Sequence, residues 1–254
     1  MVLQRHAATR IRHEVRRRML TVFSTELLTP RMRRFGFTSP DLGDFVSAAH
    51  DDHIKLFFPG ISKNGDGGET CMRDFTPRRF DRSRSTLFID FALHEAGPAT
   101  RWANAAQIGD TLEIGGPRGS TVVPDDFDWY LLIGDETALP AIGRRVEELR
   151  ADVPVTTFVL VEAGEIHDFQ TKAAWTPHWI ARNAAPDDAS LLRKALTNYA
   201  LPSGEGFVWI AAEASVARSL RNHIIEDLGH PRQWTKAAGY WKRGHSDVHE
   251  KIED

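Results

Sequence analysis

The feature that most constrains the fold is a change of pattern near residues 122–128. Before it, short apolar stretches are separated by turn residues, and after it apolar stretches alternate with segments of helical spacing. Short strands at regular intervals are typical of a small barrel, whereas alternating strands and helices indicate an open parallel sheet. The sequence therefore predicts a six-stranded β-barrel domain over residues 1–124 and an α/β domain over residues 125–254.

The first half contains six apolar stretches of strand length, which are residues 20–28, 33–37, 54–58, a strand around 73–76, 85–94 and 110–114. Residues 1–18 are rich in arginine and predict a loose arm or a strand that leads into the barrel. Residues 62–69 are rich in glycine and polar residues and predict a flexible loop. Gly97, Pro98 and Ala99 precede a helical segment that reaches residue 106.

The second half contains four apolar stretches, which are residues 129–134, 153–161, 207–212 and 237–241. They lack strict alternation, as strands buried on both faces do. Helical spacing is found in residues 136–150, 187–197 and 215–228. This half therefore predicts a parallel sheet with helices packed on it.

Composition narrows the class of protein. The chain has 254 residues and a formal net charge of -3, so no overall positive field attracts it to nucleic acid. No apolar run approaches the roughly 18 residues of a membrane-spanning helix, and no apolar segment follows the N-terminal arginines as it would in a secretory signal. The single cysteine, Cys71, excludes an internal disulfide and is interpreted as an inert thiol. We expect a cytoplasmic monomer with no nucleic-acid partner and no membrane insertion.

Residues 72–78 carry the clearest chemical signal. Arg73 and Phe75 alternate along a predicted strand, so their side chains share one face, and Thr76 adds a hydroxyl. A flavin nucleotide offers a phosphate to the guanidinium, a ring to the aromatic side chain and a polar N5 edge to the hydroxyl. The helix start at Gly97 could hold a pyrophosphate on free N–H groups. The alternatives are a half-exposed strand before a proline turn and an ordinary helix start.

Two turns of the second half lie where open α/β sheets bind ligands, at the carboxyl ends of strands. Residues 134–140 include Thr137 just before a helix, and residues 212–215 include Glu213. No glycine-rich dinucleotide fingerprint is present, so bare turns remain the alternative. Glu162 follows the second parallel strand, where an acidic side chain often binds a ribose hydroxyl, which favours NADH.

The run from His50 to His53 contains residue types that bind zinc or iron. Four adjacent residues cannot all converge on one ion. We therefore expect a solvated loop here and no metal site.

The order of motifs along the chain resembles the siderophore-interacting protein family. The matching positions are residues 73–76, Asp90, Phe91, His94, residues 97–99, 102–103, 109–110 and 116–119, then 134–137, Pro140, Trp209, Glu213 and 239–241. The family consists of FAD-dependent ferric-siderophore reductases with a ferredoxin-reductase-like fold. The resemblance covers nearly the whole chain and implies an FAD-binding barrel followed by an NAD(P)H-binding domain. The tail through His245 is similar to members with a C-terminal extension.

The resemblance also implies roles for individual residues. The cofactor-binding positions are Arg73, Asp74, Phe75, Thr76, Asp90, Phe91, His94, Gly97, Pro98, Ala99, Trp102, Thr137, Ala138, Pro140 and Glu213. Phe75 and Thr76 would flank the reacting flavin ring and take the catalytic role, and Thr137, Ala138 and Pro140 would face the nicotinamide. The family usually has tyrosine at position 75, so phenylalanine here keeps the stacking but loses the phenol hydrogen bond.

The implied activity is electron transfer from NAD(P)H through FAD to a ferric siderophore, which releases Fe(II) inside the cell. Many relatives use NADPH, which we favour, although some use NADH or ferredoxin. Basic residues in matching motifs would bind the anionic chelate, namely Lys55, Arg118, Lys242 and Arg243. The alternatives are an outward-facing barrel residue at Lys55 and a role in the turn for Arg118. The competing hypotheses are another flavin-dependent NAD(P)H or ferredoxin-linked reductase and a non-enzymatic carrier of ferric chelates.

Overall fold

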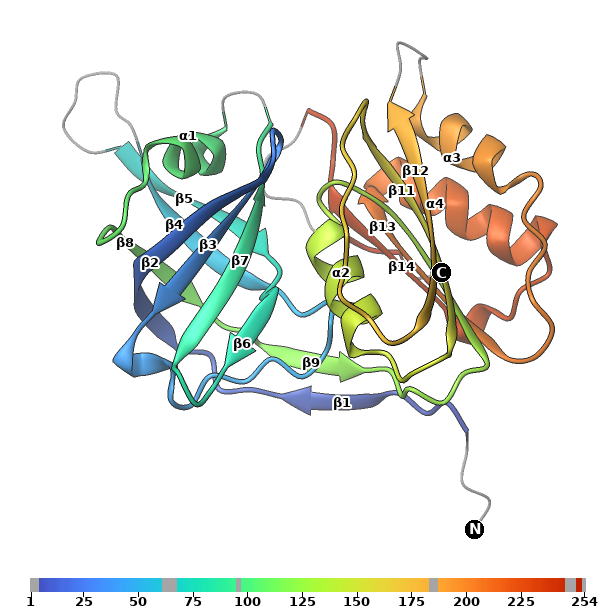
Figure 1. Ribbon diagram of the computed structural model, residues 1–254, viewed down its shortest axis with the longest axis horizontal. Coiled ribbons are helices and arrows are strands. Elements are labelled where there is room, and N and C mark those ends of the chain that lie inside the picture. Colours follow the sequence, from blue (N-terminus) through green and yellow to red (C-terminus); the bar gives the residue numbers. More distant parts are fainter. Residues whose placement is uncertain (1–4, 61–67, 95–96, 183–186, 245–249, 253–254) are drawn as a thin grey trace. The chain divides into compact units, whose positions relative to one another are not determined.

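The computed structural model describes residues 5–60, 68–94, 97–182, 187–244 and 250–252. Most of the predicted flexible loop, His245 and most of the acidic tail lie outside these residues. The chain divides into two compact units (Figure 1). The barrel unit is Ala7–Val123, and the α/β unit contains Pro124–Asp254 together with Arg5 and His6.

The barrel unit is built on one antiparallel sheet of seven strands in the order β5-β4-β8-β2-β3-β7-β6. The strands are β2 (Arg17–Thr29), β3 (Met32–Thr38), β4 (Ile54–Gly60), β5 (Gly68–Phe75), β6 (Arg79–Asp81), β7 (Thr86–Ala92) and β8 (Thr111–Gly115). Six of them were predicted. The additional strand, β6, has three residues and lies at an edge of the sheet, which is why its sequence carries little apolar signal.

The sheet curls into a barrel because of how its two edges are connected. β5 and β6 stand at opposite ends of the strand order, yet only residues 76–78 lie between them. A chain advances at most about 3.6 Å per residue, so these few residues cannot cross a flat seven-stranded sheet. Within the described residues no ladder joins the two edges. Residues 72–78, which are predicted to bind the flavin, therefore lie where the edge strands β5 and β6 approach each other, which we call the seam of the barrel.

Aromatic side chains fill the barrel. Phe35, Phe37, Phe58 and Phe91 are almost fully buried, and Trp102 of α1 (Pro98–Ala105) packs against them. This contact fixes the helix to the barrel and so fixes the position of the helix start. A separate two-stranded ladder joins β1 (Thr9–Arg12) to β9 (Gly119–Val122), which confirms a strand in the arginine-rich segment.

The α/β unit has a six-stranded sheet in the order β12-β11-β10-β13-β14-β15. Its strands are β10 (Trp129–Asp135), β11 (Pro154–Glu162), β12 (Ala174–Arg182), β13 (Gly206–Glu213), β14 (Thr235–Trp241) and β15 (Glu250–Lys251). The first five are parallel, and β15 pairs antiparallel with β14. The helices are α2 (Leu139–Glu148), α3 (Asp188–Leu196) and α4 (Ala214–Asn222). The described residues also include a π turn (His223–Asp227) and two 3-10 turns (Pro40–Leu42 and Arg232–Trp234).

α2 covers one face of the parallel sheet, while α3 and α4 cover the other (Figure 1). The apolar side chains of β10, β11 and β13 pack on α3 and α4 in one core cluster. The predicted parallel sheet is confirmed, with β12 as an additional strand. β12 escaped prediction because it is an edge strand with mostly exposed or half-buried residues and a proline at position 177.

Strand order reverses direction at β10. The chain adds β11 and β12 on one side of β10, then crosses to add β13 and β14 on the other. Such a reversal opens a crevice at the carboxyl ends of the two strands where it occurs, here β10 and β13. The last residues of these strands, Asp135 and Glu213, therefore mark the place where this sheet can bind a ligand.

Candidate functional site

Arg73 lies near the end of β5 and is half-buried. Its Nη1 donates to the carbonyl oxygen of Met72 at 2.6 Å. No carboxylate pairs with it among the described residues, whereas Arg34, Lys55 and Arg78 of the same unit all have acidic partners. A half-buried guanidinium without a counter-charge is suited to an anionic ligand such as a phosphate.

Phe75 ends the same strand with its ring only partly covered. The ring centroid lies 4.5 Å from that of Phe91 and 6.0 Å from that of Phe58. These contacts hold one side of the ring against the aromatic core, while Thr76 is 6% exposed at the start of the seam. The arrangement presents a fixed aromatic surface for stacking, and Phe91 supports it from within the core.

Asp90 is 7% exposed and belongs to an ion-pair network. Its oxygens accept from Nε and Nη2 of Arg34 at 2.6 and 2.7 Å, and Arg78 Nε lies 3.6 Å away. These contacts join β3, β7 and the seam next to Thr76. The cofactor-binding role of Asp90 stays a prediction, and the geometry supports a positioning role through Arg78.

The start of α1 is suited to a phosphate. Gly97 is the N-cap, no side chain caps the helix, and a Cβ atom added at Gly97 would meet nothing within 4 Å. Pro98 occupies the first turn, and the exposed His94 donates its backbone N–H to Thr100 Oγ1 at 3.3 Å. Free N–H groups and open space at a helix start can hold a phosphate. Together with Arg73 and Phe75, this start gives the barrel unit residues that fit FAD.

At the reversal point of the other sheet, the Asp135 carboxylate is 2% exposed and accepts four hydrogen bonds. Oδ1 accepts from the N–H and hydroxyl of Thr137 at 2.9 and 2.5 Å, and Oδ2 accepts from the Glu213 N–H at 3.2 Å and from Trp241 Nε1 at 2.8 Å. Burial raises the pKa of Asp135 to about 6, and the nearby Glu136 carboxylate adds to the rise. The ends of β10, β13 and β14 thus meet on one carboxylate.

The two helix starts at this edge differ. Glu213 caps α4 by accepting from the N–H groups of Ser215 and Val216, so that helix start already holds a carboxylate. Burial alone would raise the pKa of Glu213, but hydrogen bonds from Ser215 and from backbone amides outweigh it and lower the pKa. The start of α2 has no side-chain cap, and the N–H groups of Ala138 and Ala141 donate to the backbone carbonyl oxygens of Asp135 and Ala138. Of these two helix starts, it is the one that no side-chain carboxylate caps.

Ala138 and Pro140 lie at the start of α2 and are buried. A Cβ atom at Gly134 would come within 2.6 Å of the Ala138 methyl, so this glycine allows α2 to pack closely on β10. Thr137 is half-buried, and of these three residues it is the one with a polar side chain at the carboxyl edge of the sheet. The contacts of all three with nicotinamide stay predictions.

Sequence reasoning missed the half-buried Arg182, which ends β12. It donates to both oxygens of Glu136 at 2.9 and 3.0 Å and lies 3.4 Å from Glu162 Oε1 and from Asp188 Oδ1. The Glu136 pair outweighs burial and raises the pKa of Arg182, so this side chain is always charged. Recognition of β12 as a strand would have placed Arg182 at the ligand-binding edge.

The four predicted substrate-binding cations have different surroundings. Lys55 Nζ forms an ion pair with Asp74 Oδ2 at 3.0 Å, across the ladder that joins β4 and β5. Arg118 and Lys242 are exposed, and the described part of the chain gives neither an ion pair. Arg243 is exposed, and its backbone N–H donates to Glu213 Oε1 at 3.3 Å. Trp241 and Glu213 thus anchor the segment that carries Lys242 and Arg243.

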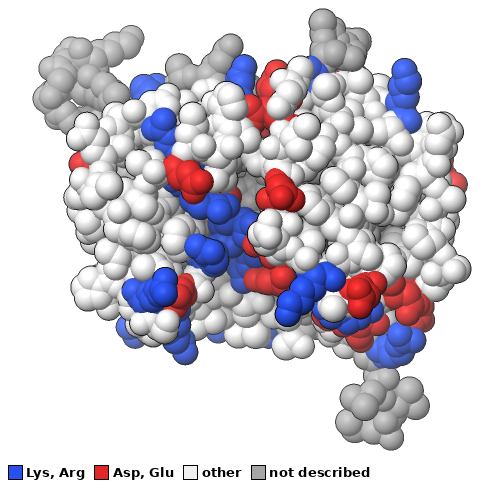
Figure 2. Space-filling model, viewed as in Figure 1, with Lys and Arg blue, Asp and Glu red and all other residues white. Residues whose placement is uncertain are grey.

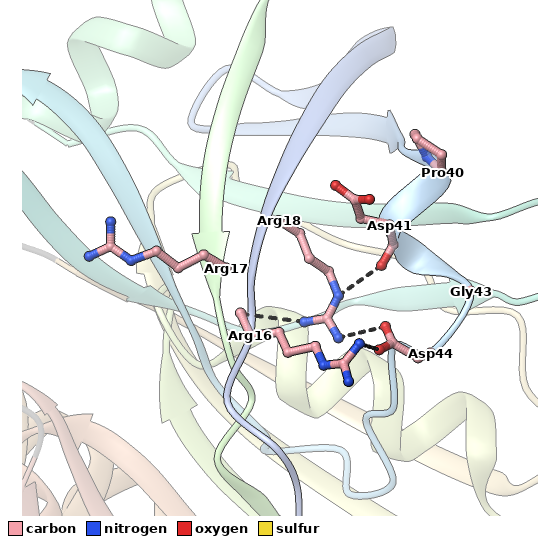
Figure 3. A pocket seen from close by; sticks show the side chains of 7 residues that line it. All are labelled: Arg16, Arg17, Arg18, Pro40, Asp41, Gly43 and Asp44. Carbon is pink, nitrogen blue, oxygen red and sulfur yellow. Dashed lines mark hydrogen bonds and ion pairs between the residues drawn. The ribbon is translucent and has the colours of Figure 1, made fainter.

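A cavity of about 390 Å³ lies beside β2 in the barrel unit and is lined by Arg16, Arg17, Arg18, Pro40, Asp41, Gly43 and Asp44 (Figure 3). Arg16 and Arg18 both reach Asp44, at 2.6 and 2.8 Å, while Arg17 points away from it. Arg18 is 5% exposed and also donates to the carbonyl oxygens of Asp41 and Gly116. These contacts join the start of β2 to the segment around the Pro40–Leu42 turn and to the turn at Gly116, so we interpret the cavity as structural. Figure 2 shows basic side chains gathered at the middle of the visible face, with acidic side chains next to them.

Residues 50–53 form a loop, as predicted, and His53 is exposed, but the prediction that the loop is solvated is wrong for two of its residues. His50 and Asp52 are each 4% exposed. Asp52 Oδ2 accepts from the Ala49 N–H and from the hydroxyls of Ser47 and Ser120, which explains its burial. Among the residues that the structure describes, no group of three His, Cys, Asp or Glu side chains is placed to hold a metal ion. The described helices also include none that is long and apolar enough to span a membrane.

Comparisons with known proteins agree with this geometry. Residues 21–121 match the model of the siderophore-interacting FAD-binding domain, and residues 127–244 match that of the siderophore-interacting protein. The chain is 32% identical over 249 residues to an NADPH-dependent ferric-chelate reductase of Escherichia coli, covering 91% of this chain and 95% of that protein.

Solved structures agree as well. A siderophore utilization protein from T. fusca has a TM-score of 0.87 and 36% identity, covering 95% of this chain and 98% of that one. A ferredoxin reductase of carbazole 1,9a-dioxygenase, at 13% identity and a TM-score of 0.63 over 87% of this chain and 68% of that one, shares the fold alone. The chain therefore belongs to the siderophore-interacting protein family and has a ferredoxin-reductase-like fold.

Proposed function

We propose that this protein is an FAD-dependent reductase that takes electrons from NAD(P)H and delivers them to the iron of ferric siderophores. The observation that carries the proposal is the Arg73 guanidinium, which has no carboxylate partner among the described residues, on the same strand as the half-covered Phe75 ring and in the unit that matches an FAD-binding domain. A charged group and a flat ring at this spacing suit the phosphate and the ring of a flavin. The relative named as a ferric-chelate reductase supports the activity.

The chain's own residues bind and orient the cofactors. Arg73 and the start of α1 at Gly97 would hold the FAD phosphates, and Phe75 would hold the ring with Thr76 at its edge. Bound FAD would supply the step that converts two-electron transfer from nicotinamide into one-electron transfer to ferric iron. Thr137 would orient the nicotinamide at the uncapped start of α2.

We propose NADPH as the preferred donor. The relative named as NADPH-dependent supports this choice, and Arg182 offers a cation at the edge where the ribose would bind. The local charge opposes the binding of NADPH, since Glu136, Glu162 and Asp188 surround Arg182 and would repel a 2′-phosphate. A phosphate would therefore have to replace one carboxylate at Arg182. Ferredoxin is an alternative donor.

We propose that an anionic ferric chelate is drawn by exposed cations, with Lys55 and Lys242 as the first candidates and Arg118 and Arg243 as the others. Iron(II) is held more weakly than iron(III) by hard oxygen ligands, so reduction releases it. We further propose that the protein acts as a monomer in the cytoplasm, where reduced nicotinamide is available.

The test begins with FAD binding. Purified protein should retain FAD after excess flavin is removed and show flavin absorbance, and Arg73→Ala should weaken retention because a charge-assisted phosphate contact is lost. With FAD bound, NADPH should drive the formation of Fe(II), trapped by a ferrous chelator, from ferric siderophores. Protein that stays colourless after incubation with FAD would favour a non-enzymatic carrier. NADPH oxidation without Fe(II) formation would favour another flavin-dependent reductase.

A further inference from the structure

We propose that Asp135 is a positioning residue that sets the direction of the Thr137 hydroxyl, so that Thr137 accepts a hydrogen bond from the nicotinamide carboxamide N–H. The inference rests on the proposed function. It assigns Asp135 a role in the specificity for the nicotinamide headgroup, through four hydrogen bonds at the reversal point of the sheet.

The hydrogen-bond directions follow from the donors around Asp135. Three of the four donors have fixed protons, namely the backbone N–H groups of Thr137 and Glu213 and the indole Nε1 of Trp241. A carboxylate only accepts, so the Thr137 hydroxyl must also give its proton to Asp135 Oδ1, at 2.5 Å. The outward side of Thr137 Oγ1 then presents lone pairs.

This polarity selects between headgroups. The carboxamide of nicotinamide has N–H donors and a carbonyl acceptor, and an outward-facing lone pair can accept only from the N–H. A 3-acetylpyridine ring keeps the carbonyl group but replaces the amino group with a methyl group. It therefore has no donor for Thr137, and we expect it to bind about fivefold more weakly, which is the effect of one ordinary hydrogen bond.

A proton on Asp135 would reverse this polarity. Of the four donors only the Thr137 hydroxyl can turn round and accept, so the added proton must sit on Oδ1 and point at Thr137 Oγ1. The Thr137 hydroxyl then donates outward, to a carbonyl that both headgroups possess. The Asp135→Asn variant should behave likewise, because its amide oxygen is needed by Glu213 N–H and Trp241 Nε1, which leaves the amino group facing Thr137.

The surroundings place this change within an accessible pH range. Burial raises the pKa of Asp135 to about 6. The other charged groups at this edge are Glu136 of the same turn, Glu162 of β11, Arg182 of β12, Asp188 of α3 and Glu213 at the start of α4. The Glu136 carboxylate adds to the rise in the pKa of Asp135, whereas the hydrogen bonds from Thr137 and Trp241 oppose it.

The test measures binding with calorimetry on the full-length, FAD-loaded protein. NADP+ is compared with its 3-acetylpyridine analogue, and NAD+ with its own analogue, at pH 7.5 and pH 5. The wild type should prefer the natural headgroup by about fivefold at pH 7.5, the strength of one hydrogen bond, and lose most of that preference at pH 5. Asp135→Asn should show little preference at either pH.

Two variants of the neighbouring residue keep the test independent of the folding of Asp135→Asn. Thr137→Val has the same shape without a hydroxyl and should abolish the preference, while Thr137→Ser should retain it. A preference that is unchanged in Asp135→Asn and Thr137→Val, or a wild-type preference that does not fall at pH 5, overturns the inference. If the wild type binds neither NADP+ nor NAD+, the proposed function fails with it, whereas binding without a headgroup preference refutes the inference alone.

Discussion

Replacing Lys55 or Asp74, which form an ion pair, gives the sharpest test of where the ferric chelate binds. Their side chains are 33% and 16% exposed, and Lys55 Nζ lies 3.0 Å from Asp74 Oδ2. If Lys55 attracts an anionic chelate, Asp74 must weaken that attraction. We therefore expect Lys55→Met to raise the KM for an anionic chelate and Asp74→Asn to lower it.

The size of the effect follows from the charge of the chelate. Three catecholate dianions around one iron(III) leave a charge of -3, whereas three hydroxamates leave a neutral complex. In water one pair of unit charges about 6 Å apart contributes about 0.7 kcal/mol, so a trianion loses about 2 kcal/mol when one lysine is removed. This corresponds to about a 30-fold rise in KM at low salt, and the rise should shrink above about 0.1 M salt because of screening.

Stability changes must be separated from this effect. Asp74 Oδ1 is buried and accepts no hydrogen bond within the described residues, so Lys55→Met leaves the whole carboxylate without its ion-pair partner. The expected cost is about 1–3 kcal/mol. Asp74→Asn should cost less, because the lysine is partly exposed and water can solvate it.

The assay is steady-state Fe(II) formation with a catecholate and a hydroxamate chelate, at low and high salt, with rates normalised to bound FAD. Opposite shifts in KM for the catecholate, with the hydroxamate unchanged, support the assignment of Lys55. If both variants leave the catecholate KM unchanged while their melting temperatures fall, the pair is only structural. Lys242→Ala is the matched comparison, because Lys242 has no ion-pair partner in the described ranges.

Three further predictions concern other parts of the molecule. Glu162→Gln should raise affinity for NADPH relative to NADH by about fivefold, since one carboxylate near the 2′-phosphate is removed, and flavin reduction rates at varied nucleotide concentration measure it. Asp90→Ala should destabilise the barrel unit by about 3–5 kcal/mol, because it removes the buried carboxylate that forms ion pairs with Arg34 and Arg78, and denaturant unfolding measures this loss. Burial would lower the pKa of His6, but hydrogen bonds with Glu205 and Asp126 raise it. That stabilisation is complete below pH of about 6.5 and is lost as pH rises through the raised value, so His6→Ala should lower the melting temperature more at pH 6 than at pH 8.

The sequence predicted the strands whose apolar side chains enter a core. Residues 54–58 and 207–212 carry continuous or alternating apolar side chains, and both became strands. β6 and β12 lie at sheet edges, where few side chains are buried, so their sequences resemble loops. Missing β12 also meant missing Arg182, since a residue can be placed at the carboxyl edge only when its strand is known.

The parts of the candidate site that consist of residues close together in the sequence were predictable. Arg73 and Phe75 share a face because they alternate on one strand. The four bonds to Asp135 were not predictable, since they join residues from three strands whose order the sequence does not reveal. The burial of His50 and Asp52 was missed for the same reason, because Asp52 accepts from Ser120, 68 residues away.

The central claim is that this protein passes electrons from reduced nicotinamide through FAD to ferric iron. Anaerobic stopped-flow absorbance tests it most directly. FAD-loaded protein is mixed with NADPH or NADH, and the reduced protein is then mixed with a ferric siderophore. The account predicts that flavin absorbance is lost, faster with NADPH, and then recovers with two Fe(II) formed for each flavin. A flavin that neither nucleotide reduces, or a reduced flavin that ferric siderophores leave unoxidised, would contradict the account.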